Sequence, residues 1–389
     1  MAIPEAYIVA ATRTAGGKRG GRLSGWHPAD MGGAVLDALV RRAGVDPAAI
    51  DDVILGCVTQ AGEQSAHIGR NAVLASSLPA SVPAVTIDRQ CGSSQQAIHF
   101  AAQAVMSGTQ DLVIACGTES MTRVPMGSAI MADKGALPFS QKILQRFHVT
   151  GFSQFTGAEM ISKKYGFTRE MLDEFGLSSH RKAATATQLG AFEAEITKLP
   201  ITTPEGHAEL HTQDEGIRYD ATPASMAGVK LLMENGTLTA ATASQICDGA
   251  SGVMIASTQA VKDHNLSPLA RIHNLTVTAG DPVIMLEEPV FATQRALARC
   301  DMKIDDIDLY EVNEAFAPVP LAWLNVLGAD PKRLNVNGGA IALGHPLGAS
   351  GTKLMTTLLY ALKAQGKRYG LQTMCEGGGV ANVTIIEAF

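Results

Sequence analysis

The sequence of 389 residues has few aromatic residues (5%) and few charged residues (17%), and its net charge is −6. No block of like charges forms an acidic or basic tail, so the composition argues against a nucleic-acid-binding protein. A local cluster of Lys and Arg still allows an anionic small-molecule ligand. No uninterrupted apolar run approaches the ~20 residues that a membrane-spanning helix needs.

The cysteines are few and show no local pattern. The six are scattered, without a C-x-x-C pair or a metal-ligand spacing, at positions 57, 91, 116, 247, 300 and 375. In a chain of this length, that distribution predicts reduced intracellular thiols and no metal site. The first residues lack the pattern of a signal peptide, and Glu387-Ala388-Phe389 is not a peroxisomal signal. We therefore expect a cytoplasmic protein.

Hydrophobic residues make up 46% of the chain, and 39 residues are glycine, which is typical of an α/β protein of two or three domains. The chain also repeats itself. A helical pattern over 92–107 leads into an apolar strand at 111–115, and a helical pattern over 350–365 leads into a strand at 369–374. A Gly-rich turn and β-branched strand over 248–256 likewise resemble 377–386. The sequence predicts one α/β domain that has been duplicated.

The first copy of the repeat is interrupted. Between Glu119 and about Ser244 the composition has no counterpart in the second half, which indicates an insertion that covers the active site. We predict an N-terminal core domain at 1–120 plus 245–266, an inserted loop domain at 121–244 and a C-terminal core domain at 267–389.

Cys91 follows a predicted strand at 85–88 and precedes a predicted helix that begins at Ser93. The positive end of a helix dipole lowers the pKa of a thiol and favours the thiolate, so Cys91 is a candidate nucleophile. The alternative is a small buried side chain, because free cysteine is among the most buried residue types.

His345 lies in a segment, 335–348, that has too many glycines for a packed element. Pro346 disfavours α geometry at His345, so we expect the ring to project from a turn as the best base in the chain. The alternative is a solvated loop histidine.

Cys375 ends a predicted strand and is followed by Glu376 and three glycines. Glycine amides can form an oxyanion site, although a tight turn between strands also explains them. Asn313 follows a predicted strand at 309–312. Its side chain either caps the next helix or orients a water or a substrate carbonyl.

Taken together, these strings resemble the motifs of the thiolase family, in that family's order and along essentially the whole chain. They are C-G-S-S-Q-Q-A from Cys91, N-E-A-F at 313–316, G-G-A-I-A-L-G-H-P at 338–346 and C-E-G-G-G at 375–379. The resemblance implies a thiolase fold, in which two duplicated βαβαβαββ core domains form five αβαβα layers with an inserted loop domain. It also implies a homodimer or homotetramer.

The resemblance further implies a mechanism. Cys91 would attack the keto carbon of a 3-ketoacyl-CoA after His345 removes its proton, and Cys375 would protonate the enolate of acetyl-CoA. His345 and a water held by Asn313 would stabilise the enolate oxygen. The backbone N–H groups of Cys91 and Gly377 would form a second oxyanion hole.

Coenzyme A is expected as a substrate, with no covalently bound cofactor and no metal. Arg218 resembles the family position near the nucleotide, and Ser244 resembles the serine that meets pantetheine. Both residues are alternatively surface residues of the insertion.

Two departures from the family pattern bear on the substrate. Many members carry a small or apolar residue in place of Glu376, and we expect this carboxylate to point away from the Cys375 thiol. The segment 152–157 lacks the His-Met pair of short-chain acetoacetyl-CoA thiolases. This favours a degradative thiolase for a longer or bulkier acyl chain in fatty-acid or related lipid breakdown. The alternative is a biosynthetic acetoacetyl-CoA thiolase.

Other readings have less support. A decarboxylating ketoacyl synthase of the same fold lacks the second catalytic cysteine, and no local signature of a cysteine hydrolase surrounds Cys91. Retention of all four candidate catalytic residues argues against a non-catalytic acyl-CoA-binding protein. A thiol-redox role is a further alternative, because Cys91 and Cys375 are expected to lie near one another.

Overall fold

The computed structural model describes residues 4–130, 135 and 137–389. Its main sheet is mixed, with the strand order β11-β12-β13-β10-β1-β9-β5-β3-β4. Two halves of the chain form it, and they meet where β1 and β10 pair antiparallel at Tyr7–Arg271 and Ile8–Ala270. Within the described residues, no helix is long and apolar enough to cross a membrane.

Each half alternates strands and helices as the repeat predicts. The first half contains β1 (Ala6–Thr14), α1 (Pro28–Ala43), β3 (Asp52–Gly56), α2 (Ile68–Leu74), β4 (Ala84–Ile87), α3 (Ser93–Met106), β5 (Leu112–Ser120) and β9 (Cys247–Ser257). The second contains β10 (Ala270–Ala279), α9 (Glu288–Arg299), β11 (Leu309–Val312), α10 (Pro318–Leu327), α11 (Ala340–Leu343), α12 (Ser350–Gln365), β12 (Tyr369–Glu376) and β13 (Val380–Ala388). The short elements β2 (Gly17–Lys18) and α8 (Thr258–Asp263) flank the first half.

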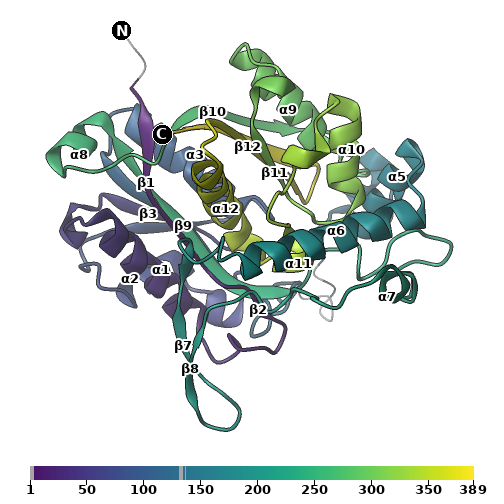
Figure 1. Ribbon diagram of the computed structural model, residues 1–389, viewed down its shortest axis with the longest axis horizontal. Coiled ribbons are helices and arrows are strands. Elements are labelled where there is room, and N and C mark those ends of the chain that lie inside the picture. The colour runs from purple at the N-terminus through teal and green to yellow at the C-terminus, as the bar shows by residue number, and fades with distance from the viewer. Residues whose placement is uncertain (1–3, 131–134, 136) are drawn as a thin grey trace.

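Helices α3 and α12 pack between the two half-sheets and form the central layer (Figure 1). Their apolar residues share one core with both half-sheets, which includes Ile98, Val253, Met355 and Ile386. Helices α1 and α2 cover the outer face of the first half-sheet, and α9 and α10 cover that of the second. The predicted five layers are therefore confirmed.

The two halves differ in detail from the predicted repeat. In the second half, the strand that corresponds to β4 is reduced to a single parallel bridge between Tyr310 and Leu334. The glycines at 248–252, expected in a turn, instead lie within β9, which is buried along its whole length. Gly252 is required there because a Cβ would lie 2.9 Å from the Leu39 side chain.

The segment between β5 and β9 contains α4 (Gln141–Phe147), α5 (Gln154–Tyr165), α6 (Arg169–Gln188), β6 (Ile196–Thr197), β7 (Leu199–Thr202), β8 (Ala208–His211) and α7 (Pro223–Ala227). Strand β6 pairs parallel with β1, so the insertion adds to the edge of a core strand as well as covering the core. Strands β7 and β8 form a hairpin that projects from the body of the molecule (Figure 1). Residues 131–134 and 136 of the predicted insertion lie outside the described residues.

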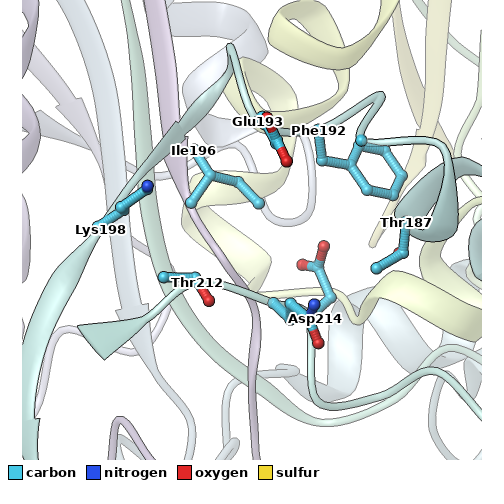
Figure 2. A pocket seen from close by; sticks show the side chains of 9 residues that line it. Thr187, Phe192, Glu193, Ile196, Lys198, Thr212 and Asp214 are labelled. Atoms are coloured by element: carbon cyan, nitrogen blue, oxygen red, sulfur yellow. The ribbon is translucent and has the colours of Figure 1, made fainter. Parts of the chain in front are cut away.

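A buried ion cluster fastens the insertion to the core. Arg13 in β1 is fully buried, and its guanidinium donates to both carboxylate oxygens of Asp214, at 2.8 and 3.0 Å, and to Glu195 at 2.5 Å. The guanidinium also lies over the ring of Phe192. Asp214 and Phe192 line a cavity of about 230 Å³ at this junction (Figure 2).

Replacing Arg13 with Met is expected to destabilise the protein strongly, because two buried carboxylates would lose their counter-charge. Removal of one partner from a buried pair costs about 3–5 kcal/mol of unfolding free energy. The matched control is Arg22→Met, which breaks the exposed pair with Glu209 and should cost less than about 1 kcal/mol. Urea unfolding followed by circular dichroism measures both, and equal midpoints for the two variants would contradict the prediction.

Candidate active site

Cys91 lies at the start of α3, as predicted. Gly92 is the N-cap of the helix, and Gln90 has a φ of +48°, a conformation that is uncommon outside glycine. Two side-chain contacts hold this turn: the N–H of Gln90 donates to Asp88 at 2.6 Å, and the Ser93 hydroxyl donates to the carbonyl of Gln90 at 2.6 Å. The chain therefore presents Cys91 from a constrained turn between β4 and α3.

The expected low pKa of the Cys91 thiol is wrong. Burial raises the pKa of Cys91 to about 12, and the Glu376 carboxylate adds to this rise. Desolvation and a like charge therefore outweigh the dipole of α3. The half-buried cysteine is a neutral thiol at rest and needs a base before it can attack.

His345 is only 3% exposed, so the interpretation as a solvated loop histidine is wrong. Contrary to expectation, the glycine-rich segment that precedes His345 contains a packed element. Residues Ala340–Leu343 form the single turn α11, and all four of these residues are buried. The backbone N–H of His345 donates to the carbonyl of Gln245 at 3.0 Å. Burial, together with the charge of Lys353, lowers the pKa of His345 to about 3.

The hydrogen bonds of His345 define which ring nitrogen is free. Its Nδ1 lies 2.5 Å from the hydroxyl of Ser350, and that hydroxyl donates to the carbonyl of Pro346 at 2.8 Å. Because the hydroxyl proton is used in this way, Ser350 accepts from Nδ1–H. The unprotonated Nε2 of the neutral ring is left to act as a base.

Asn313 lies beside the free nitrogen of His345. Its Nδ2 is 3.4 Å from His345 Nε2, and the buried Oδ1 has no partner within the described residues. The helix-capping interpretation is wrong, because α10 begins only at Pro318 and its N-cap is Ala317. The orphaned oxygen instead suits a bound water or a polar group of a ligand.

Cys375 lies near the end of β12 and is completely buried beside Phe316 and Ile341. Burial, then the neighbouring Cys91 and Glu376, raise the pKa of Cys375 well above its ordinary value. The two cysteines are thus close enough to influence each other. Gly377 lies against the Gln90 side chain, since a Cβ on Gly377 would be 2.9 Å from Gln90 Oε1.

Glu376 follows Cys375 in β12, and successive side chains of a strand point to opposite faces. Its charge still contributes to the raised pKa of Cys375, so the expectation that it points away from that thiol stays a prediction. The carboxyl group of Glu376 lies against Gly92, in the turn that holds Cys91. A Cβ on Gly92 would lie 1.8 Å from Glu376 Oε1, so a larger residue at this position would force the Glu376 side chain to move. Both carboxyl oxygens are buried and have no partner among the residues that the structure describes. Burial raises the pKa of Glu376 to about 8 against the opposing charge of Arg89.

One cavity of about 470 Å³ links the candidate CoA-binding residues to His345. Arg218 and Ser244 both line it, with Lys18 and Arg19 as further cations. Its apolar lining includes Met121, Met126, Phe155, Leu232 and Phe316. The cavity therefore combines basic residues that suit phosphates with an apolar lining and a neutral imidazole.

The site contains groups that the sequence analysis missed. Ser350 fixes the tautomer of His345, and the Gln245 amide donates to the carbonyls of Gly216 and Ile341 at 2.8 and 2.7 Å. Glu119 accepts from the N–H of Gly348 at 2.8 Å and so fixes the loop that follows His345. Ser350 lies only five residues after His345, but the two side chains meet because of the turn between α11 and α12, which the sequence does not reveal. Among the described residues, no cluster of three or more His, Cys, Asp or Glu side chains is arranged to hold a metal ion.

Comparisons with known proteins agree with this arrangement. Residues 6–259 match the model of the thiolase N-terminal domain, and residues 266–388 match that of the thiolase C-terminal domain. The chain belongs to the thiolase family. It is an acyltransferase of this family, as the resemblance of its motifs predicts.

Individual relatives span nearly all of this thiolase. It is 51% identical to the steroid 3-ketoacyl-CoA thiolase FadA6 of Mycobacterium tuberculosis, over 98% of this chain and 94% of that protein. It is 39% identical to an acetyl-CoA acetyltransferase of Cupriavidus necator, over 98% and 99% of the two chains. The crystal structure of the Bacillus anthracis acetyl-CoA acetyltransferase matches with a TM-score of 0.91 and 34% identity, over the full length of both chains.

Replacing Glu376 with Gln is expected to increase the reactivity of Cys91 only above about pH 8. Below its pKa of about 8 the carboxyl is neutral, like the amide; above it, the carboxylate opposes the Cys91 thiolate. Each unit of pKa removed from Cys91 raises the thiolate fraction about tenfold. Iodoacetamide labelling at several pH values, mapped by mass spectrometry, measures the effect.

Peptide mapping in that experiment separates Cys91 from Cys300, the other cysteine that is not fully buried. Cys91→Ser provides the background, and Glu288→Gln is a matched control in α9. Equal labelling rates for the wild type and Glu376→Gln at pH 9 would show that the carboxylate does not act on Cys91.

Proposed function

We propose that this thiolase catalyses CoA-dependent cleavage of a 3-ketoacyl-CoA to acetyl-CoA and a shortened acyl-CoA in lipid degradation. The observation that carries the proposal is the single cavity that joins Arg218 and Ser244 to the neutral base His345. Relatives named 3-ketoacyl-CoA thiolase, from Marinobacter nauticus and Bacillus subtilis among others, support it.

The first step uses two neutral groups. His345 Nε2 takes the proton of the Cys91 thiol, and the sulfur attacks the keto carbon of the substrate. The backbone N–H groups of Cys91 and Gly377 donate to the oxyanion, and loss of one such donor typically costs ~10²–10³ in rate. Cleavage of the C2–C3 bond then leaves an acyl group on Cys91.

The second cysteine completes the proton transfers. Cys375, whose pKa lies well above its ordinary value, gives its proton to the enolate of acetyl-CoA. His345 and a water bound by Asn313 stabilise the enolate oxygen, since Oδ1 of Asn313 has no partner in the described part of the chain. A second molecule of CoA then gives its thiol proton to the Cys375 thiolate and takes the acyl group, while the released Cys91 sulfur recovers its proton from His345. The reaction is reversible, as a Claisen condensation.

Coenzyme A binds as a substrate in this proposal, and no bound cofactor or metal takes part. Arg218 lies at the surface beside the cavity and suits the nucleotide phosphates, while Ser244 suits pantetheine. The resemblance to the family supports a homodimer or homotetramer. The scattered cysteines support a cytoplasmic location.

The lining of the cavity favours an acyl chain longer than acetoacetyl. The segment that lacks the His-Met pair contains Ser153, Gln154 and Phe155. The Phe155 ring lines the cavity and packs edge-on against Phe316, with 5.4 Å between the ring centroids. The similarity to a steroid 3-ketoacyl-CoA thiolase supports a bulky substrate. The alternative, a biosynthetic acetoacetyl-CoA thiolase, is favoured by the relatives named acetyl-CoA acetyltransferase.

Replacing Cys91 with Ala is expected to abolish the CoA-dependent loss of 3-ketoacyl-CoA, because no other group would carry the acyl intermediate. The assay follows absorbance of the ketoacyl thioester from acetoacetyl-CoA to long-chain and sterol-derived substrates. The wild type should prefer the longer substrates. Folded wild-type protein that cleaves none of them would contradict the proposal, and a preference for acetoacetyl-CoA would favour the biosynthetic alternative.

Replacing Phe155 with Ala is expected to lower kcat/KM for long acyl chains about tenfold, as expected for lost contact with a few methylene groups. Acetoacetyl-CoA, which has no further methylenes to bury, should change little. The matched control is Phe291→Ala, which removes an exposed ring in α9 on the outer layer. An equal loss for short and long substrates would place Phe155 against pantetheine instead of the acyl chain.

A further inference from the structure

Lys353 is a buried lysine that the mechanism above does not use. It lies in the first turn of α12 and is only 4% exposed, which is rare for lysine unless its charge is compensated. Its Nζ donates to the carbonyl of Leu343 at 2.5 Å and to that of Gly344 at 3.0 Å. These are the two peptide groups that immediately precede His345.

From these contacts we propose that Lys353 is a positioning residue for His345, which fixes the peptide groups before the histidine and places a positive charge beside its ring. The inference rests on the proposed function, since it takes His345 as the base. The single turn of α11 ends in carbonyls that have no partner within the helix, and a cation at that end satisfies them. Gly344 is the C-cap of α11, and His345 follows it directly.

Several contacts crowd this point and leave the loop little freedom. A Cβ on Gly344 would lie 2.6 Å from the Cys247 sulfur, and one on Gly16 would lie 2.7 Å from the carbonyl oxygen of Leu343. On the other side of His345, Ser350 binds Nδ1 and Glu119 binds the N–H of Gly348. Without Lys353, the carbonyls of residues 343 and 344 would lose the donor that now satisfies them.

The charge of Lys353 is influenced by the ion cluster that fastens the insertion. Burial lowers the pKa of Lys353, whereas Cys247, Asp214 and Glu195 raise it and Arg13 lowers it. Glu195 also accepts from the Thr357 hydroxyl at 3.0 Å, one turn further along α12. The two buried carboxylates of the insertion thus act electrostatically on both Arg13 and Lys353.

The electrostatic effect on His345 follows from this placement. A cation beside the ring disfavours the imidazolium, so the neutral base persists at lower pH. The other charged or titratable groups around the loop are Glu119, Cys247, Asp214 and Arg13. Burial is the main cause of the lowered pKa of His345. Among the charged groups around the loop, only Lys353 lowers this pKa further.

The experiment compares Lys353→Met, Lys353→Arg and the control Lys363→Met, an exposed lysine of the same helix. Lys353→Met should lower kcat about tenfold or more, with KM for the ketoacyl-CoA nearly unchanged. The acid limb of its kcat/KM profile should move to higher pH, because His345 becomes easier to protonate. Lys353→Arg should restore most of the rate and the position of the limb, and Lys363→Met should match the wild type.

A Lys353→Met enzyme with wild-type kcat and an unmoved acid limb would overturn the proposal. If this variant does not fold, Lys353→Gln, which keeps a donor without the charge, replaces it and should show the same shift of the acid limb. Alkylation of Cys91 across the same pH range gives a readout independent of turnover. The two proposals can fail separately. If the wild type cleaves no ketoacyl-CoA, but Lys353→Met still changes the alkylation of Cys91, the proposed function is contradicted and the inference about Lys353 is retained.

Discussion

The buried guanidinium of Arg13 has to be neutralised inside the protein, and this requirement joins three distant parts of the chain. Its partners Glu195 and Asp214 lie 182 and 201 residues away, in the insertion. Glu195 also binds Thr357 of α12, so the cluster reaches the central helical layer. Because the cost of an unpaired buried charge is several kcal/mol, the insertion is held in one position over the core. The cavity that connects Arg218 with His345 depends on that position.

Desolvation determines the resting state of the site. It raises the pKa values of Cys91 and Cys375 and lowers that of His345, so the thiols and the imidazole are neutral near pH 7. A standing thiolate would be reactive towards any electrophile. A neutral cysteine instead becomes nucleophilic only when a neutral base is within reach and the substrate oxyanion is stabilised. The neutral resting state therefore favours a mechanism in which a base removes the thiol proton during the reaction, and not one in which the sulfur is a permanent thiolate.

The places of the candidate residues were predictable because each carries a local signal. Cys91 stands between a strand and a glycine at a helix start, and His345 stands before proline in a glycine-rich segment. The helix at 350–365 and the strand at 309–312 were predicted with their exact bounds. The ionisation of Cys91 was not predictable, because it depends first on the burial of the thiol and then on the carboxylate of Glu376, which is distant in sequence and lies against Gly92 in the fold. The role of Asn313 was also ambiguous, since the chain continues for four residues before α10 begins.

The duplication explains why these groups meet. Helices α3 and α12 occupy equivalent places in the two halves, and their first turns pack against each other: the N–H of Thr352 donates to the Ser94 hydroxyl at 3.0 Å, and a Cβ on Gly351 would lie 2.0 Å from the Gln95 nitrogen. Two helix N-termini in contact concentrate positive potential. That potential would favour negative charge on a bound oxygen, which suits the proposed oxyanion. Each half contributes one loop at this point, with Cys91 before α3 and His345 before α12, so neither half alone contains both the candidate nucleophile and the candidate base.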